Sequence, residues 1–369
     1  MYNQVGVGSS LEVGRRKGYT SLPVVRLGVV VLGVIGACLV LSNHLVPGSN
    51  YVFEEDQLLA TNTSTNGHEE GMIRKSELDI VLENASMEDK TVIITNLNDA
   101  WAEPNSIFDL FLESFRIGNK TQRLVKHLVV ICFDEKAYNR CLDLHPHCYH
   151  LQIHGFNFTS EAFFMTPRYL EIVWRKIELL ATVLDKGYNF VFSDTDIMWL
   201  RDPFPRFDPD ADLQTSCDMI YRNSSFIDYL PNTGFNYVKS NNQTIQFYKV
   251  WYESRKLYPS LHDQDVFKKI INDSFITNIG LKLEFLDTSY FGGFCEPSKD
   301  LRLVCTMHAN CCVGLQNKIH DLQILLEDWK KFMSLDPSKQ PNASWSDPQH
   351  CRYIDTNISL FMFIQNWSY

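Results

Sequence analysis

The chain has 369 residues, of which 45% are hydrophobic and 13% aromatic, and this is enough to build a substantial core in one large or two ordinary domains. Its formal net charge is −10. A nucleic-acid-binding protein needs a basic face to neutralise phosphates, so the charge argues against nucleic acid, or any other polyanion, as a partner.

The first 89 residues contain a candidate membrane anchor and little that could form a core. Residues 27–46 are uncharged and mostly apolar over the length that an α-helix needs to cross a bilayer. Basic residues precede this segment and no basic cluster follows it, so the positive-inside rule predicts a cytosolic tail at 1–26 and a luminal remainder. A cleaved signal peptide is the alternative, but no small-x-small cleavage site follows. Residues 47–89 are polar and predict a luminal stem.

The sequons and cysteines agree with a luminal location. Ten Asn-x-Ser/Thr sequons occur along the chain. Nine of the ten cysteines lie beyond the apolar segment, where an oxidising lumen permits disulfides. Because nine is odd, at least one thiol is free or paired between chains, and a homo-oligomer stays open. The histidine-rich stretch 145–150 could be drawn as a zinc site, but it lacks a second ligand pair, and Cys148 is better explained as the partner of a cysteine such as Cys141.

Strands alternating with helices are predicted from residue 90 onward. The β-branched run 91–97 and the apolar run 124–133 predict strands, and 148–153 predicts a short third one. Further strands are expected at 217–221, 235–240 and 282–286, and further helices at 243–256, 264–271 and 317–333. This alternation predicts an α/β domain over 90–335 with a mainly parallel sheet, followed by an atypical tail at 336–369.

The strongest helix signal, at 167–186, leads directly into a buried strand. Thr166 can cap the helix, Pro167 suits its first turn, and apolar residues repeat along it with helical period. Gly187 ends the helix, and the strand 188–193 follows at once.

Two aspartates, Asp194 and Asp196, come directly after this strand. Ligands of open α/β sheets bind at the carboxyl ends of the strands. Carboxylate oxygens suit Mg²⁺ or Mn²⁺, which leave coordination sites free for the diphosphate of a nucleotide-sugar donor. An acidic turn before Pro203 is the alternative, because D-x-D alone is common.

Five motifs in chain order resemble the plant nucleotide-diphospho-sugar transferase family, which is related to glycosyltransferase family 77. They are VFSDTDIMWLRDPF, PNTGFNYVKS, HDQDVF, YFGGFCEPS and TMHANCC, and the resemblance covers about residues 75–335. It implies a type II Golgi membrane protein with the GT-A fold, a Rossmann-like domain that binds Mn²⁺ and a UDP-sugar. It also implies retaining transfer of xylose, arabinose or galactose onto a cell-wall polysaccharide or glycoprotein.

The resemblance also implies a metal site. Asp194 and Asp196 match the D-x-D, with Asp196 expected to contact the metal directly and Asp194 to be shared between ribose and metal. His308, in TMHANCC, matches the late histidine that completes such sites, and imidazole is a reasonable third ligand for Mn²⁺. A structural histidine in a cysteine-rich loop is the alternative.

Further residues are expected around the donor. Asp263, Gln264 and Asp265 match the D-Q-D that faces the donor sugar in similar enzymes, although acidic residues are also favoured at a helix N-terminus. For the nucleotide and diphosphate, Thr95 and Asn96 would contact uracil and ribose. Lys176 is predicted to contact the diphosphate, and the alternative is a solvated position on the helix face. Asn232 and Gly234 are predicted to line the sugar pocket in a flexible loop, and the alternative is a plain turn.

Two other functions remain open at this point. A haloacid-dehalogenase-like phosphatase also places D-x-D after an apolar strand, but it would need a further downstream acidic pair and gives His308 no role. A non-catalytic sugar-binding protein on the same fold is the second.

Overall fold

A computed structural model describes residues 75–152, 165–222 and 227–351 of the chain, all within one compact unit, Met72–Tyr369. The predicted cytosolic tail, the candidate anchor at 27–46 and most of the predicted stem lie outside these residues. Among the helices that the structure describes, none is both long and apolar enough to span a bilayer. The membrane anchor therefore stays a prediction.

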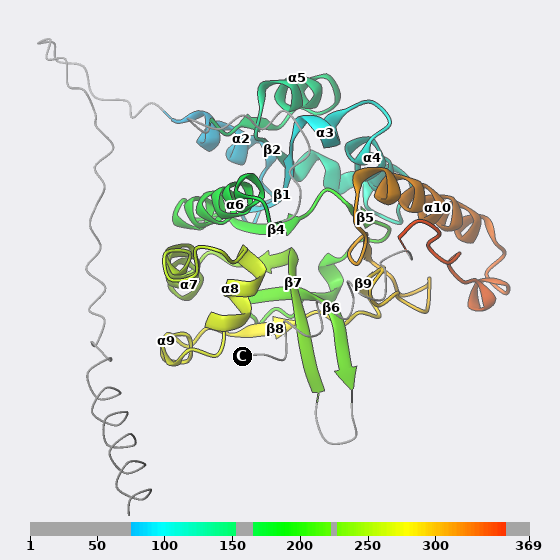
Figure 1. The fold of residues 1–369 in the computed structure, drawn as a ribbon. Helices are drawn as coiled ribbons and strands as arrows, with labels where there is room; N and C mark the ends of the chain where they lie inside the picture. The colour runs from blue at the N-terminus through cyan, green and yellow to red at the C-terminus, as the bar shows by residue number, and fades with distance from the viewer. Residues whose placement is uncertain (1–74, 153–164, 223–226, 352–369) are drawn as a thin grey trace, which may run out of the picture. The chain divides into compact units, whose positions relative to one another are not determined.

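Helices and strands alternate along most of the described chain (Figure 1). The strands are β1 (Thr91–Leu97), β2 (Leu128–Cys132), β3 (Cys148–His150), β4 (Asn189–Ser193), β5 (Ile197–Trp199), β6 (Leu213–Arg222), β7 (Ile227–Val238), β8 (Leu283–Phe285), β9 (Phe291–Gly293) and β10 (Thr306–His308). The α-helices are α2 (Glu77–Ala85), α3 (Asp99–Ala102), α4 (Ile107–Ile117), α5 (Glu135–Leu144), α6 (Pro167–Asp185), α7 (Asn242–Ser254), α8 (Asp263–Ile270), α9 (Ser274–Asn278) and α10 (Leu315–Ser334). Short 3-10 helices are η1 (Gln122–His127), η2 (Phe204–Arg206) and η3 (Gln340–Asn342).

The main sheet is mostly parallel, as the alternating pattern predicts. Within the described residues it has seven strands in the order β3-β2-β1-β4-β7-β6-β8. Strand β7 is antiparallel to both of its neighbours, β4 and β6, while the other neighbouring pairs are parallel. The predicted α/β class with a mainly parallel central sheet is confirmed.

Each face of this sheet carries its own apolar core, because successive side chains of a strand point to opposite faces. On β1, Ile93 and Leu97 belong to one buried cluster, and Val92 and Ile94 belong to the other. Helices α4 and α10 cover the first face, and α6 and α7 cover the second (Figure 1). Burial on both faces explains why the central strands are continuous apolar runs in the sequence.

Helix α6 and strand β4 form as predicted. The Thr166 hydroxyl accepts a hydrogen bond from the Tyr169 backbone N–H, and Pro167 occupies the first turn. The apolar stripe of the helix is buried, and Gly187 follows with a φ of 81°, a conformation that glycine adopts without strain. This helix and turn lead into β4, which lies in the middle of the sheet.

The residues just before β1 differ from the predicted stem. Residues Glu77–Ala85 form α2, which buries Leu78, Leu82 and Ala85 against the sheet. Ser76 and Asp79 form a capping box at the start of this helix. The polar composition of 47–89 as a whole concealed this short amphipathic segment.

A small second sheet was not foreseen from the sequence. Within the described residues it has the order β5-β10-β9, with β10 antiparallel to β5 and parallel to β9. Two disulfides lie next to it: Cys295–Cys311 links the segments that follow β9 and β10, and Cys312–Cys351 links the second of these segments to the predicted C-terminal tail.

The other cysteines agree with the sequence argument. Cys141 pairs with Cys148, as expected, so Cys148 is not a thiolate ligand for zinc. Among the described cysteines, the thiols of Cys132, Cys217 and Cys305 are free and buried. Burial raises the pKa of the Cys217 thiol to about 12, which keeps it protonated and unreactive.

Removal of the Cys295–Cys311 bridge is expected to destabilise the protein by about 3 kcal/mol, because a bridge closing a loop of this size restricts the unfolded chain by roughly that amount. The bridge spans 16 positions that include the whole of β10. A variant with both cysteines changed to serine should show the loss in denaturant unfolding. A change below about 0.5 kcal/mol would mean that the surrounding packing alone holds this loop.

Candidate active site

Asp194 and Asp196 lie at the carboxyl end of β4, in the middle of the main sheet. The Asp194 backbone N–H donates to the Gly234 carbonyl on β7 at 2.7 Å, and the Ile197 N–H donates to the Asp194 carbonyl at 3.1 Å. The two aspartates therefore form the turn between β4 and β5. The two interpretations of these residues, an acidic turn and a metal site, therefore do not exclude each other.

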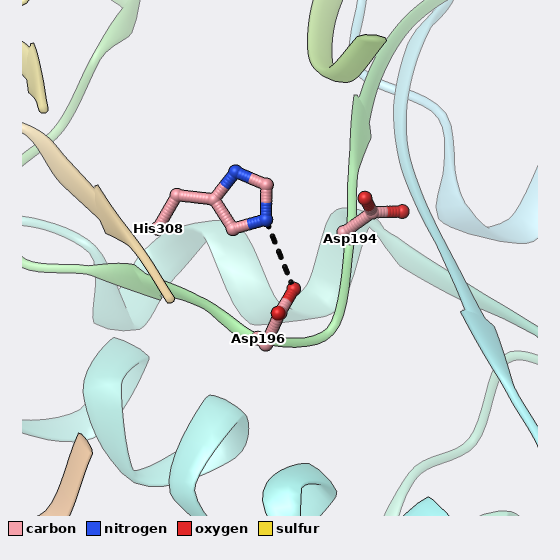
Figure 2. A group of neighbouring side chains, drawn as sticks. All are labelled: Asp194, Asp196 and His308. Carbon is pink, nitrogen blue, oxygen red and sulfur yellow. Dashed lines mark ion pairs between the residues drawn. The ribbon is translucent and has the colours of Figure 1, made fainter. Parts of the chain in front are cut away.

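Strand β10 brings His308 to this turn. His308 is paired with Ile197 in the β5–β10 register, and the Ala309 N–H donates to the Asp196 carbonyl at 3.0 Å. The His308 Nε2 atom lies 3.3 Å from Asp196 Oδ1 (Figure 2). One ligand atom from each of Asp194, Asp196 and His308 lies within 4.8 Å of the other two. The three predicted metal ligands are thus brought together.

Gly234 leaves the space that such a ligand set needs. A Cβ atom at this position would lie 2.6 Å from Asp194 Oδ2 and 2.9 Å from His308 Cε1. Two carboxylates and an imidazole form a donor set that suits Mn²⁺ well and Mg²⁺ acceptably. The residues present therefore fit a divalent cation.

Replacement of Gly234 by alanine is expected to push the Asp194 carboxylate and the His308 ring apart and to weaken Mn²⁺ binding by about 10- to 100-fold, an effect of the size seen when ligand orientation is lost. Gly280→Ala is a matched control, because no atom lies within 4 Å of a Cβ there, although its φ of 70° adds some strain. Titration calorimetry with MnCl₂ measures both. Equal affinity in wild type and Gly234→Ala would show that this space is not used by the cation.

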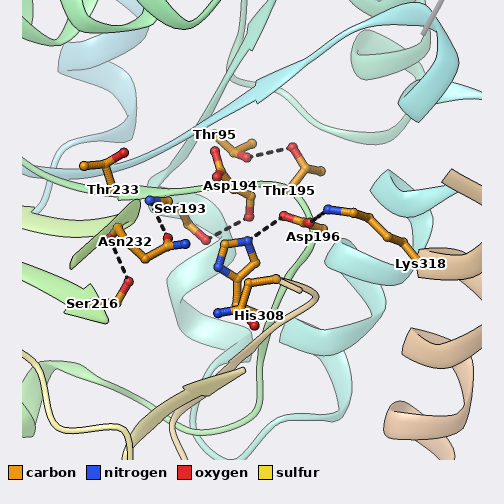
Figure 3. Close-up of polar contacts among 12 residues, drawn as sticks. Thr95, Ser193, Asp194, Thr195, Asp196, Ser216, Asn232, Thr233, His308 and Lys318 are labelled. Atoms are coloured by element: carbon orange, nitrogen blue, oxygen red, sulfur yellow. Dashed lines mark hydrogen bonds and ion pairs between the residues drawn. The ribbon is translucent and has the colours of Figure 1, made fainter. Parts of the chain in front are cut away.

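The two carboxylates differ in their electrostatic surroundings. Burial raises the pKa of Asp196, but the Lys318 ammonium and the His308 ring lower it by more, so its pKa lies below the ordinary value. The Lys318 Nζ atom is 2.5 Å from Asp196 Oδ2 (Figure 3). For Asp194, burial outweighs the opposing effect of Lys176, and the pKa is raised. Asp196 is therefore held ionised by two ion pairs, whereas Asp194 forms none among the described residues.

Lys176 and Asp263 form a second buried ion pair beside the site. Their charged atoms are 2.7 Å apart, and Lys176 is only 7% exposed. The Lys176 ammonium also lies over the Phe192 ring, 4.9 Å from its centroid. The alternative of a solvated helix face is wrong for Lys176, because the helix turns it inward toward α8. Its contact with a donor diphosphate stays a prediction.

The D-Q-D residues occupy the first turn of α8, and they point in different directions. The cap of this helix is His262, whose side chain accepts from the Gln264 N–H, so none of the three is itself the N-cap. Asp263 accepts from the Thr233 hydroxyl at 3.3 Å, and Gln264 Oε1 accepts from the Thr233 N–H at 3.1 Å. The Asp265 carboxylate is instead partly exposed, and its Oδ2 atom lies 3.3 Å from His262 Nε2. Asp263 and Gln264 therefore face β7, and Asp265 does not share these contacts.

Thr95 and Asn96 end β1 next to the acidic turn. The Thr95 hydroxyl lies 3.1 Å from the Thr195 hydroxyl, which donates to the Asn96 carbonyl at 2.5 Å (Figure 3). Thr95 is fully buried. These bonds fasten the turn between Asp194 and Asp196 to the neighbouring strand, whereas the predicted uracil and ribose contacts remain predictions.

The predicted flexible loop at PNTGF is instead part of β7. Asn232 pairs with Ser216 of β6, and Asn232 and Gly234 both lie within the buried run of the strand. Proline and glycine usually disfavour a central strand, and they misled the prediction here. The ladder accommodates Pro231 because the register of β6 and β7 shifts at Thr215/Ser216 and again at Cys217/Met219.

Three polar residues at the site were missed from the sequence: Lys318, Asp218 and Asn310. Lys318 follows TMHANCC by six positions, at the start of a predicted helix, where a lysine usually faces solvent. Asp218 lies within a strand pattern, and Asn310 within the histidine motif, without a signal of their own. Only their placement in the fold identifies them.

The sequence matches now identify the family. A model of the nucleotide-diphospho-sugar transferases matches residues 123–322, more than half of the chain. The chain belongs to this family. It is a glycosyltransferase. The uncharacterized protein At4g15970 of Arabidopsis thaliana is 49% identical over 290 residues, which cover 78% of this chain and 76% of that protein.

Two further similarities to glycosyltransferases are more limited. The UDP-galactose:fucoside alpha-3-galactosyltransferase of Dictyostelium discoideum is 39% identical over 72 residues, which cover 18% of this chain and 10% of that protein. Mouse xyloside xylosyltransferase 1 aligns with a TM-score of 0.38 and 13% identity, over 60% of this chain and 98% of that structure. A TM-score this low does not support assignment to a family, so membership of the family rests on the sequence matches.

Proposed function

We propose that this glycosyltransferase has the GT-A fold and depends on Mn²⁺ or Mg²⁺, and that it moves xylose, arabinose or galactose from a UDP-sugar to a cell-wall polysaccharide or glycoprotein, with retention at the anomeric carbon. The observation that carries the proposal is the cluster of Asp194, Asp196 and His308 at the carboxyl end of β4. The similarity to a transferase named for UDP-galactose supports a UDP-sugar donor.

In this proposal the cation cluster and Lys318 both act on the diphosphate of the donor. Asp194, Asp196 and His308 would hold the cation, which when bound neutralises the diphosphate and stabilises the departing UDP. Lys318 carries a positive charge at the edge of the same cluster, where it can bind a diphosphate oxygen.

The sugar end of the donor is assigned to Asp263 and Gln264. Burial raises the pKa of the Asp263 carboxyl, but the Lys176 ammonium and His262 lower it by more, so Asp263 stays ionised. The Gln264 amide can hold sugar hydroxyls, and the ionised Asp263 carboxylate beside it can stabilise the positive charge that develops on the ring. Asp265, which contacts His262, has the weaker claim to a catalytic role.

The alternative functions have less support. Membership of the nucleotide-diphospho-sugar transferases favours sugar transfer over a phosphatase of the haloacid-dehalogenase type. A non-catalytic sugar-binding protein would have no need for two carboxylates, an imidazole and a lysine in one partly buried cluster.

We also propose that residues 27–46 anchor the chain in the Golgi membrane as a type II protein, with the catalytic unit in the lumen. The apolar run and the basic residues before it support this topology, and the three disulfides of the described residues agree with an oxidising compartment.

The proposal is tested by screening the purified luminal part of the chain, from residue 72 onward, for slow hydrolysis of UDP-xylose, UDP-arabinose and UDP-galactose with Mn²⁺, with Mg²⁺ and with EDTA. Hydrolysis of at least one donor that EDTA abolishes would support it and name the sugar. Absence of cation-dependent UDP binding by calorimetry would contradict it. Release of phosphate from an aryl phosphate would instead favour the phosphatase.

A further inference from the structure

Asp218 lies at an irregular point of β6, close to the predicted sugar end of the site. The register between β6 and β7 shifts between Cys217 and Met219, so Asp218 has no direct partner in the ladder. Such irregularities redirect side chains and are common next to active sites. Here the Asp218 carboxylate is directed into a group of three side-chain amides.

The three amides come from three separate motifs of the sequence. Asp218 Oδ1 accepts from Asn232 Nδ2 at 2.7 Å and from Asn310 Nδ2 at 2.8 Å. Asp218 Oδ2 lies 3.4 Å from Gln264 Nε2. One carboxylate thus joins PNTGF on β7, TMHANCC, which begins with β10, and HDQDVF at the start of α8.

The oxygen of each amide is already engaged by a backbone N–H. Asn232 Oδ1 accepts from the Gly234 N–H at 2.8 Å, and Asn310 Oδ1 accepts from the Cys295 N–H at 3.1 Å. Gln264 Oε1 accepts from the Thr233 N–H at 3.1 Å. The same division holds in all three cases: the amide oxygen faces a backbone donor, and the amide nitrogen faces Asp218.

An ionised carboxylate accepts hydrogen bonds and donates none. If the Gln264 amide were reversed, its oxygen would face the Asp218 carboxylate and its nitrogen would face the Thr233 N–H. Two acceptors would then face each other at Asp218 and two donors at Thr233, so partly buried polar groups would be left without hydrogen bonds. Asp218 and the backbone donors therefore select one orientation for each amide.

We propose that Asp218 is a positioning residue that fixes the orientation of the Gln264 amide, and through Asn232 and Asn310 couples the sugar end of the site to the segments that carry Gly234 and His308. This inference rests on the proposed function, because it assigns Asp218 a part in the transfer reaction. Asp218 acts through its neighbours and is distinct from the cation ligands.

The decisive variant is Asp218→Asn, which keeps the shape of the side chain but replaces one acceptor oxygen with an NH₂ donor. We expect kcat for donor hydrolysis to fall by about 10- to 100-fold, the range for a misplaced catalytic group, with Mn²⁺-dependent UDP affinity within about twofold of wild type. Glu284→Gln, an exposed carboxylate-to-amide change on the neighbouring strand β8, should leave both unchanged. Wild-type kcat in Asp218→Asn would overturn the inference.

A double-mutant cycle separates positioning from general damage to the fold. In a Gln264→Ala background, Asp218→Asn should lower the remaining kcat by less than about threefold, because the amide that links Asp218 to the sugar end of the site is gone, while Asn232 and Asn310 can still donate to the remaining oxygen of residue 218. An equal loss in both backgrounds would overturn the inference. Thermal unfolding of every variant identifies any that fail to fold.

A crystal structure of Asp218→Asn provides a readout that does not depend on activity. We expect at least the Gln264 amide to turn away from the substituted side chain or from the Thr233 N–H. If all three amides keep their present contacts, Asp218 does not orient them, and the inference is wrong. This result stands even if wild type hydrolyses no UDP-sugar, an outcome that would count against the proposed function alone.

Discussion

Asp196→Asn is expected to abolish Mn²⁺-dependent UDP binding and to lower kcat for donor hydrolysis by at least about 100-fold, which is the usual loss when a principal electrostatic group is removed. Asp196 forms two ion pairs: its Oδ1 atom lies 3.3 Å from His308 Nε2, and its Oδ2 atom lies 2.5 Å from Lys318 Nζ. Its low pKa keeps it charged throughout the physiological range, so it supplies the negative charge that a cation needs. Calorimetry with UDP, with and without MnCl₂, measures the first effect.

The control for this experiment is Asp143→Asn, an exposed aspartate on α5, a helix that contributes no residue to the cluster. It should bind and hydrolyse like wild type. If Asp196→Asn retained more than about a tenth of wild-type activity, the cation would have to be held elsewhere, and the proposed function would lose its main support.

Lys176→Met is expected to destabilise the protein by about 3–5 kcal/mol, because it leaves the Asp263 charge buried without its ammonium partner. Asp263 is 2% exposed, so water cannot replace the lost ammonium. Denaturant unfolding measures the loss. Adding Asp263→Asn to Lys176→Met should recover part of it, because the double variant has no unpaired buried charge.

Arg175→Met, one position away on α6, is the matched control for this change. Arg175 pairs with Glu171 and Glu178 at the surface, where such pairs contribute about 0–1 kcal/mol. A comparable loss in the two variants would show that helix packing, and not the buried charge, is responsible.

The pH dependence gives an independent check on the Lys176 result. In wild type the pKa of Asp263 is lowered by folding, so the ion pair stabilises the protein at neutral pH. This stabilisation is lost as the pH falls below about 4, the pKa of an aspartate in the unfolded chain. In Lys176→Met, burial without a cation should raise that pKa instead. Protonation of Asp263 then relieves the penalty, so the stability gap between variant and wild type should narrow as the pH is lowered from 7 to 5.

The parts of the fold that could be predicted are those with strong local signals. Helix α6 has a cap, a proline in its first turn, a periodic apolar face and a terminal glycine, and β4 follows as a buried apolar run. The position of Asp194 and Asp196 after β4 follows from these signals, as does the mainly parallel sheet.

The parts that could not be predicted depend on contacts between distant segments. Strands β5, β9 and β10 have three residues each, too few for a periodic pattern, and they exist because they pair with one another. The grouping of His308 with the aspartates was available only through resemblance to a family. Lys318 and Asp218 are charged residues in otherwise ordinary helix and strand patterns, so only the tertiary structure shows that they face the site.

With the proposed cation bound, the β5–β10 pairing would also link the amount of folded protein to the supply of that cation. Asp196 and His308 are 112 positions apart in the sequence, so an unfolded chain does not present them together. A cation that binds the folded cluster and not the unfolded chain adds its binding free energy to that of folding, about 2.7 kcal/mol when its concentration is a hundred times Kd. The cation proposed for the reaction would by the same binding protect the enzyme from unfolding and degradation.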